Sequence, residues 1–101
     1  MKVYRGDRTI DGIVVSVDDK PLDERRDIAT ISEDGFEWGF LGPASTQLAL
    51  AILADHFDDP ARALRFHEDV AGEIVANFAN EWVLTSADID DSVAALEERS
   101  A

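Results

Sequence analysis

The longest apolar run in this 101-residue chain is Leu48-Ala49-Leu50-Ala51-Ile52-Leu53-Ala54. It is far shorter than the roughly 20 apolar residues that cross a bilayer. Because the run leaves almost no polar face, a helix that contains it must be covered on every side. We therefore expect a central helix around which the other elements pack.

Proline and aspartate mark the start of this helix and of the next one. Pro43 suits the first helical position, where its missing N–H would have no helical partner, and the central helix is predicted over residues 43–57. Asp59 can cap a following helix that begins at Pro60. That second helix is predicted over residues 60–78, with an apolar stripe of Leu64, Ala71, Ile74, Val75 and Phe78.

A third helix is predicted over residues 86–98. Thr85 and Asp88 have the spacing of a capping box, in which each side chain accepts a hydrogen bond from the backbone N–H of the other. The helix carries a narrow apolar seam of Ile89, Val93 and Leu96.

Four short segments have the character of β-strands: residues 2–5, 13–17, 36–40 and 81–84. The first two can form a hairpin, because Asp11-Gly12 offers a turn between them. Residues 36–40 place three aromatic side chains at alternate positions, which predicts a half-buried strand whose aromatic face covers the helices. These aromatics are Phe36, Trp38 and Phe40.

The two halves of the sequence predict one α+β domain over residues 1–101. Residues 1–40 are mainly strands and turns, and the rest is mostly helical, with no Ser/Gly-rich linker between them. We expect a small antiparallel sheet of three or four strands packed against about three helices.

Acidic residues outnumber basic ones by 22 to 9, giving a formal net charge of -13. In dilute buffer the mutual repulsion opposes compaction, whereas at molar salt the Debye length falls to about 3 Å and the repulsion is screened. An acid-rich, lysine-poor composition therefore predicts a halophilic, haloarchaeal protein.

The same composition limits the partners and the compartment. The lack of cysteine and of an apolar leader predicts a reducing, cytoplasmic location. Nucleic acids and anionic membranes usually require clustered lysine and arginine, so we expect neither as a direct partner, whereas another protein remains open. No motif predicts a cofactor or a metal ion.

Histidines and aspartates are the first candidates for chemistry. His56 and His67 lie on different predicted helices, so their spacing does not favour a shared metal. Asp55, Asp58 and Asp59 could bind a cation through oxygen ligands, but such clusters are expected by chance in so acidic a chain, and Asp59 is needed as a cap.

Glu37 is the other candidate, because a carboxylate between aromatic rings can acquire a raised pKa and act as a general acid. Strand alternation, however, places Glu37 on the face opposite Phe36 and Trp38. We therefore favour solvent exposure, or pairing with Arg5 or Arg8, over catalysis.

Four segments of the chain resemble a domain-of-unknown-function family of small prokaryotic proteins. They are Tyr4-Arg5-Gly6, Gly35-Phe36-Glu37-Trp38-Gly39-Phe40, residues 47–55 and Trp82-Val83-Leu84-Thr85. The segment 41–46 departs from the family pattern by having less glycine. The resemblance implies one domain over almost the whole chain and carries no known activity or catalytic residue.

The leading hypothesis is a small non-enzymatic accessory or protein-interaction domain, because the core is well patterned and no polar constellation converges. Its predicted contact residues are Tyr4, Arg5, Phe36, Glu37, Trp38 and Phe40; if buried, the aromatics among them are simply core. One alternative is a DNA-mimicking inhibitor that presents carboxylates to a basic groove. Another is a small enzyme that uses Glu37 or His67.

Overall fold

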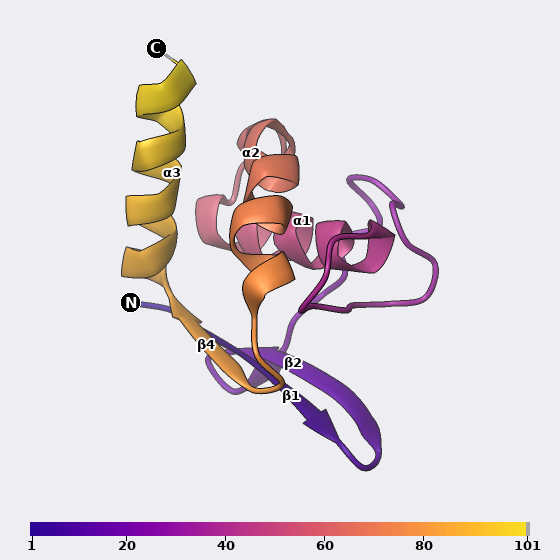
Figure 1. The fold of residues 1–101 in the computed structure, drawn as a ribbon. Coiled ribbons are helices and arrows are strands. Elements are labelled where there is room, and N and C mark those ends of the chain that lie inside the picture. The colour runs from indigo at the N-terminus through magenta and orange to yellow at the C-terminus, as the bar shows by residue number, and fades with distance from the viewer. Residues whose placement is uncertain (101) are drawn as a thin grey trace.

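The computed structural model describes residues 1–100, with side chains for residues 1–99. Its elements, in chain order, are β1 Val3–Thr9, β2 Gly12–Val17, β3 Lys20–Pro21, α1 Pro43–Phe57, α2 Pro60–Glu73, the 3-10 turn η1 Val75–Asn77, β4 Trp82–Thr85 and α3 Ser86–Ser100. The four strands form one antiparallel sheet in the order β3-β2-β1-β4, and the helices lie to one side of it (Figure 1). The predicted α+β fold is confirmed.

Strand register determines which side chains of the sheet face the helices. Tyr4 pairs with Val17 on β2 and with Leu84 on β4, and Gly6 pairs with Trp82. Paired residues share a face of the sheet, so these residues form its inner face, and Tyr4 is completely buried. The β1–β2 hairpin extends beyond the helices (Figure 1).

α1 is the central helix, as its apolar run predicts. Every residue from Leu48 to Leu53 is completely buried. α2 packs against it through a stripe of Ala63, Phe66, Val70 and Ala71. Among residues 1–100 no helix is long and apolar enough to span a bilayer.

Both predicted helix caps are present. The Asp59 carboxylate accepts the N–H groups of Ala61 and Arg62 at 3.1 and 3.3 Å. At the start of α3, Asp88 accepts the Thr85 N–H at 3.0 Å, and Thr85 Oγ1 accepts the Asp88 N–H at 3.2 Å. α3 then continues to Ser100, slightly beyond the predicted end at residue 98.

The prediction of one helix over residues 60–78 is wrong beyond Glu73. Ile74, with φ -118° and ψ -64°, is the C-cap of α2, and the chain continues as the 3-10 turn η1. The Asn77 side chain donates to the Glu73 carbonyl at 3.1 Å, which satisfies one of the last carbonyls of α2. The predicted stripe is also rotated, because Leu64 lies on the exposed side of α2.

The predicted strand over residues 36–40 is wrong as well. Residues 22–42 contain no strand and follow an irregular path along the right of Figure 1. Gly35 and Gly39 have φ values of 84° and 86°, a left-handed conformation that interrupts an extended chain. The aromatics therefore do not share one face: Trp38 is completely buried, whereas Phe40 is 53% exposed.

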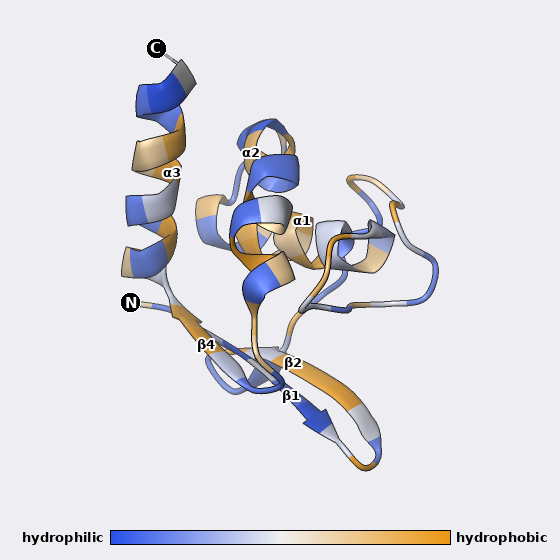
Figure 2. Cartoon of the chain, viewed as in Figure 1, coloured by the Kyte–Doolittle hydropathy of each residue, from blue (hydrophilic) through white to orange (hydrophobic). Residues whose placement is uncertain are grey.

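The first strands are longer than the sequence predicts. β1 continues to Thr9 instead of ending at Arg5, and because Thr9 pairs with Gly12, the hairpin turn is Ile10-Asp11 rather than Asp11-Gly12. Hydrophobic residues follow β2 out toward this turn (Figure 2). The hairpin thus presents apolar side chains beyond the core.

Candidate functional site

Of the predicted contact residues, Tyr4 has a structural role. Its ring is completely buried, and its hydroxyl donates to Asp55 Oδ2 at 2.7 Å. Lys2 Nζ binds the same oxygen at 3.0 Å, so β1 is attached to the end of α1. Burial, reinforced by the hydrogen bond to Asp55, raises the pKa of Tyr4 far above its ordinary value.

Trp38 is likewise part of an internal aromatic cluster. It meets Trp82 edge-to-face, with ring centroids 5.8 Å apart, and the Arg8 guanidinium lies 4.7 Å above its ring centroid. Trp82 in turn stacks on Phe78 at 4.3 Å. The Trp82 ring lies directly against Gly6, where a Cβ atom would come within 2.1 Å of the indole nitrogen. Tyr4 and Trp38 therefore cannot contact a partner unless the core opens.

Glu37 forms the predicted ion pair, with Arg8 and not with Arg5. Its Oε2 atom accepts from an Arg8 guanidinium nitrogen at 2.7 Å and from the Trp38 N–H at 3.2 Å. Arg8 also donates to the Trp38 carbonyl at 2.8 Å. These contacts attach the segment around Glu37 to β1.

Gln47, which the sequence did not single out, organises the irregular segment before α1. Its amide is completely buried and makes four hydrogen bonds. Its oxygen accepts the N–H groups of Ile31 and Ser32 at 2.7 and 3.1 Å. Its nitrogen donates to the carbonyls of Glu24 and Ala29 at 2.7 and 3.1 Å.

The segment fixed in this way forms one wall of a groove of about 790 Å³ beside β2. We call it the β2 groove. Its apolar side chains are Ile13, Val14, Val15, Pro21, Leu22, Phe36 and Ala44, and its acidic side chains are Glu24, Asp34 and Glu37. Phe36 and Glu37 are the predicted contact residues that belong to it, and no lysine or arginine among the described side chains lines it.

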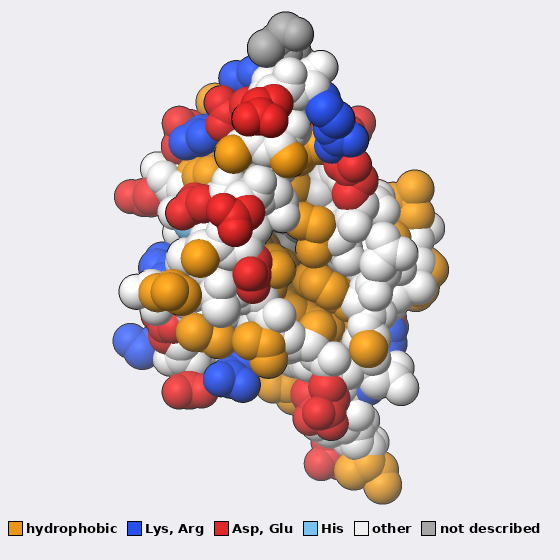
Figure 3. All heavy atoms as spheres, turned by 60° about the vertical axis from the view of Figure 1, so that its left-hand side comes forward, with side chains coloured by type: hydrophobic (Ala, Val, Ile, Leu, Met, Phe, Trp, Pro, Cys, Tyr) orange, Lys and Arg blue, Asp and Glu red, His pale blue; other side chains and the backbone are white. Residues whose placement is uncertain are grey.

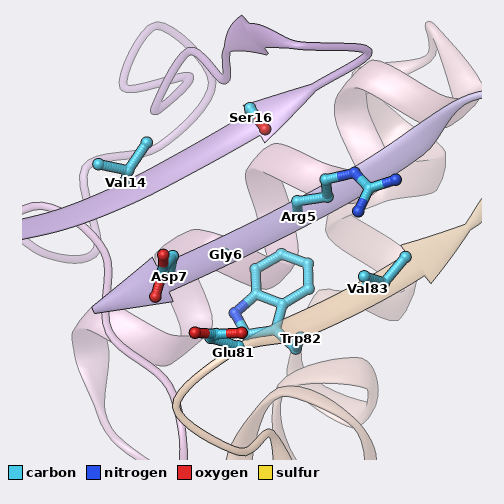
Figure 4. A pocket seen from close by; sticks show the side chains of 8 residues that line it. All are labelled: Arg5, Gly6, Asp7, Val14, Ser16, Glu81, Trp82 and Val83. Atoms are coloured by element: carbon cyan, nitrogen blue, oxygen red, sulfur yellow. The ribbon is translucent and has the colours of Figure 1, made fainter. Parts of the chain in front are cut away.

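A smaller hollow of about 490 Å³ lies on the outer face of the sheet (Figure 4). Arg5 lines it on one side of Trp82, and Asp7 and Glu81 lie on the other side (Figure 4). Among the described side chains Arg5 has no carboxylate partner. Arg5 could bind a small anion in this hollow, but Asp7 and Glu81 lie on the other side of Trp82 and do not form one site with Arg5.

The histidines have separate contacts. His56 Nε2 lies 2.7 Å from Asp90 Oδ1 and connects α1 to α3, whereas His67 Nδ1 lies 2.6 Å from the Leu64 carbonyl. Asp55, Asp58 and Asp59 also serve different purposes, because Asp55 binds Lys2 and Tyr4 while Asp59 caps α2. Within the described residues no group of three His, Cys, Asp or Glu could hold a metal ion.

The fold and the site define a small α+β domain with an open, acid-rimmed apolar groove. The chain belongs to a family of unknown function, DUF6166, whose family model matches residues 4–95. The resemblance to a domain-of-unknown-function family is thus confirmed. No curated protein and no solved structure matches the chain.

The sequence missed most of the groove because its walls come from segments far apart in the chain. One signal was available: Ile13, Val14 and Val15 are three consecutive apolar residues in a predicted strand. Such a run places apolar side chains on both faces, so at the tip of a hairpin some of them must remain uncovered.

Proposed function

We propose that this chain is a non-enzymatic protein-interaction domain of a salt-rich cytoplasm and that the β2 groove is its contact surface. The groove itself carries the proposal. It combines an apolar lining with partial exposure, since Ile13 is 36% exposed and Phe36 is half-buried. Exposed apolar surface rimmed by polar groups is typical of interaction sites.

An enzymatic role has less support. The titratable side chains among the described residues that line the β2 groove are three carboxylates, Glu24, Asp34 and Glu37. Glu37 is engaged by Arg8 and by the Trp38 N–H. His67 does not line this groove, so no acid and base groups converge there.

The charge pattern supports a halophilic surface over DNA mimicry. Six of the nine basic side chains each pair with a different carboxylate, so 16 of the 22 acids have no lysine or arginine partner among the described side chains. On the face in Figure 3 the carboxylates are scattered among basic and apolar side chains and form no continuous row. A mimic of DNA would present rows of negative charge like the phosphates of a duplex.

Capture of a partner in molar KCl tests the proposal. The immobilised protein is incubated with lysate of a halophilic archaeon, in parallel with the variants Ile13→Glu and Leu64→Glu. Both variants place an acid at an exposed apolar position, at 36% and 41% exposure, but only Ile13 lines the groove. We expect a partner that wild type and Leu64→Glu retain and Ile13→Glu loses. Equal recovery by both variants, or no reproducible partner, would contradict the proposal.

A further inference from the structure

We infer that the β2 groove binds an extended, lysine- or arginine-bearing segment of a partner protein, which adds to the sheet as a strand beside β2. The inference rests on the proposed function and names the chemistry of the partner. An open strand edge, an apolar lining and an acidic rim together carry it.

On the side away from β1, the edge of β2 is open only at its N-terminal end, around Ile13. β3 pairs only with Ser16 and Val17, and beyond them the Leu22 N–H donates to the Val15 carbonyl at 3.1 Å. Val15 therefore directs its backbone polar groups away from β1, and the alternation of an antiparallel strand makes Ile13 do the same. Within residues 1–100 no backbone hydrogen bond reaches Ile13 from that side. Its N–H and C=O are free to pair with an added strand.

The apolar lining lies where side chains of an added strand would fall. Ile13 pairs with Arg8, so like Val15 it points to the inner face of the sheet. Neighbouring strands lie about 4.8 Å apart, and alternate side chains share a face. A strand beside Ile13 therefore directs every second side chain toward Leu22 and the half-buried Phe36. This geometry requires apolar residues at alternate positions of the partner segment.

The rim of the groove selects positive charge for the remaining positions. Glu24 and Glu37 hold Arg26 and Arg8, whereas the Asp34 carboxylate has no partner among the described side chains. A lysine or arginine of the segment can pair with Asp34 at contact distance. At molar salt the Debye length is about 3 Å, so screening removes long-range attraction and leaves this contact and the apolar burial.

A second copy of the chain suits the groove poorly. If two copies joined through the same open edge, the contact would be isologous and would bring their acidic rims together. Like charges directly opposed across strands destabilise the pairing. With a net charge of -13 on each copy, neither rim could offer the missing cation.

The test uses the full chain in molar KCl and a labelled short peptide in which lysine alternates with valine. We expect fluorescence anisotropy to report saturable binding that Ile13→Glu weakens about tenfold or more, because the substitution puts a charge where valine side chains of the peptide would be buried. Leu64→Glu should bind like wild type. Asp34→Lys should weaken binding severalfold, while Asp91→Lys, at an exposed acid on α3, should not.

Backbone methylation of the peptide tests the strand itself. Alternate N–H groups of an added strand face β2, and the others face away. Two peptides methylated on one or the other set should therefore differ about tenfold in affinity. The inference is overturned if both methylated peptides bind equally, if a glutamate–valine peptide binds as well as the lysine–valine one, or if the parent peptide does not bind. The proposed function is judged separately, because an Ile13-dependent partner from the lysate would sustain it in each of these cases.

Discussion

Replacing Gln47 by leucine removes a buried amide that bonds to four backbone groups of the irregular segment before α1. Leucine is similar in size and suits the buried site, so the change tests the four hydrogen bonds rather than the packing. Their loss leaves two N–H and two C=O groups without their partner, at Ile31, Ser32, Glu24 and Ala29.

These four hydrogen bonds set the expected loss of unfolding free energy. Three of the four hydrogen bonds are only part-buried, so water can replace some of them. We therefore assign a loss of about 1 kcal/mol of unfolding free energy to each bond. The apolar side chain regains about 1 kcal/mol. We expect Gln47→Leu to lose about 3 kcal/mol, a large part of the roughly 5–15 kcal/mol that stabilises a domain.

Urea unfolding in molar KCl measures this loss, and limited trypsin digestion locates it. Arg25 and Arg26 lie within the segment that Gln47 holds, so cleavage there should be faster in the variant. Thr46→Val is the matched control, because it removes a single local bond to the Gly42 carbonyl at 2.9 Å. A loss below about 1 kcal/mol for Gln47→Leu, with unchanged cleavage, would show that the Gln47 hydrogen bonds do not hold this segment.

Three further predictions concern packing, pH and salt. Gly6→Ala should destabilise the protein by about 2 kcal/mol in urea unfolding, because the added Cβ would overlap the Trp82 ring. Gly72→Ala has open space around it and should stabilise α2 by about 0.5–1 kcal/mol. Equal effects of the two substitutions would contradict the close packing of Trp82 on Gly6. Tyr4 keeps its proton in the folded state, so unfolding free energy should hold steady up to about pH 10 and then fall by about 1.4 kcal/mol per pH unit as the unfolded tyrosine ionises. Tyr4→Phe loses the hydrogen bond to Asp55, so its unfolding free energy near neutral pH should be about 1 kcal/mol lower, and it should not decline at alkaline pH. In wild type, the absorbance of the single tyrosine shows whether it ionises in the folded or in the unfolded state. Unfolding free energy should rise from dilute buffer to molar KCl, and equal stability in both would count against a halophilic protein and favour DNA mimicry.

Elements with strong local signals could be predicted from the sequence. The apolar run of α1, the cap at Asp59 and the capping box at Thr85 depend on neighbouring residues, and each is present in the structure. Pairing of Glu37 with Arg8 was one of the alternatives that the sequence left open, although the strand that suggested it is absent. Local chemistry therefore predicts the frame of the fold.

Long-range contacts account for what the sequence could not predict. Aromatic alternation at residues 36–40 is the pattern of a strand, but left-handed Gly35 and Gly39 turn the chain, and Trp38 enters the core. Gln47 bonds to groups 15 to 23 residues away, which no periodicity encodes. The β2 groove exists because such contacts place Phe36 opposite the strand residues that line the same groove.

Photo-crosslinking from two phenylalanine positions shows whether a partner binds in the β2 groove. A photoreactive phenylalanine analogue is placed at position 36, inside the β2 groove, or at position 40, which does not line it and is 53% exposed. Non-specific collisions favour the more exposed position. In lysate of a halophilic archaeon at molar KCl, we expect a discrete crosslinked partner from position 36 and none from position 40. Equal labelling from both positions, or labelling only from position 40, would contradict the β2 groove as the contact surface.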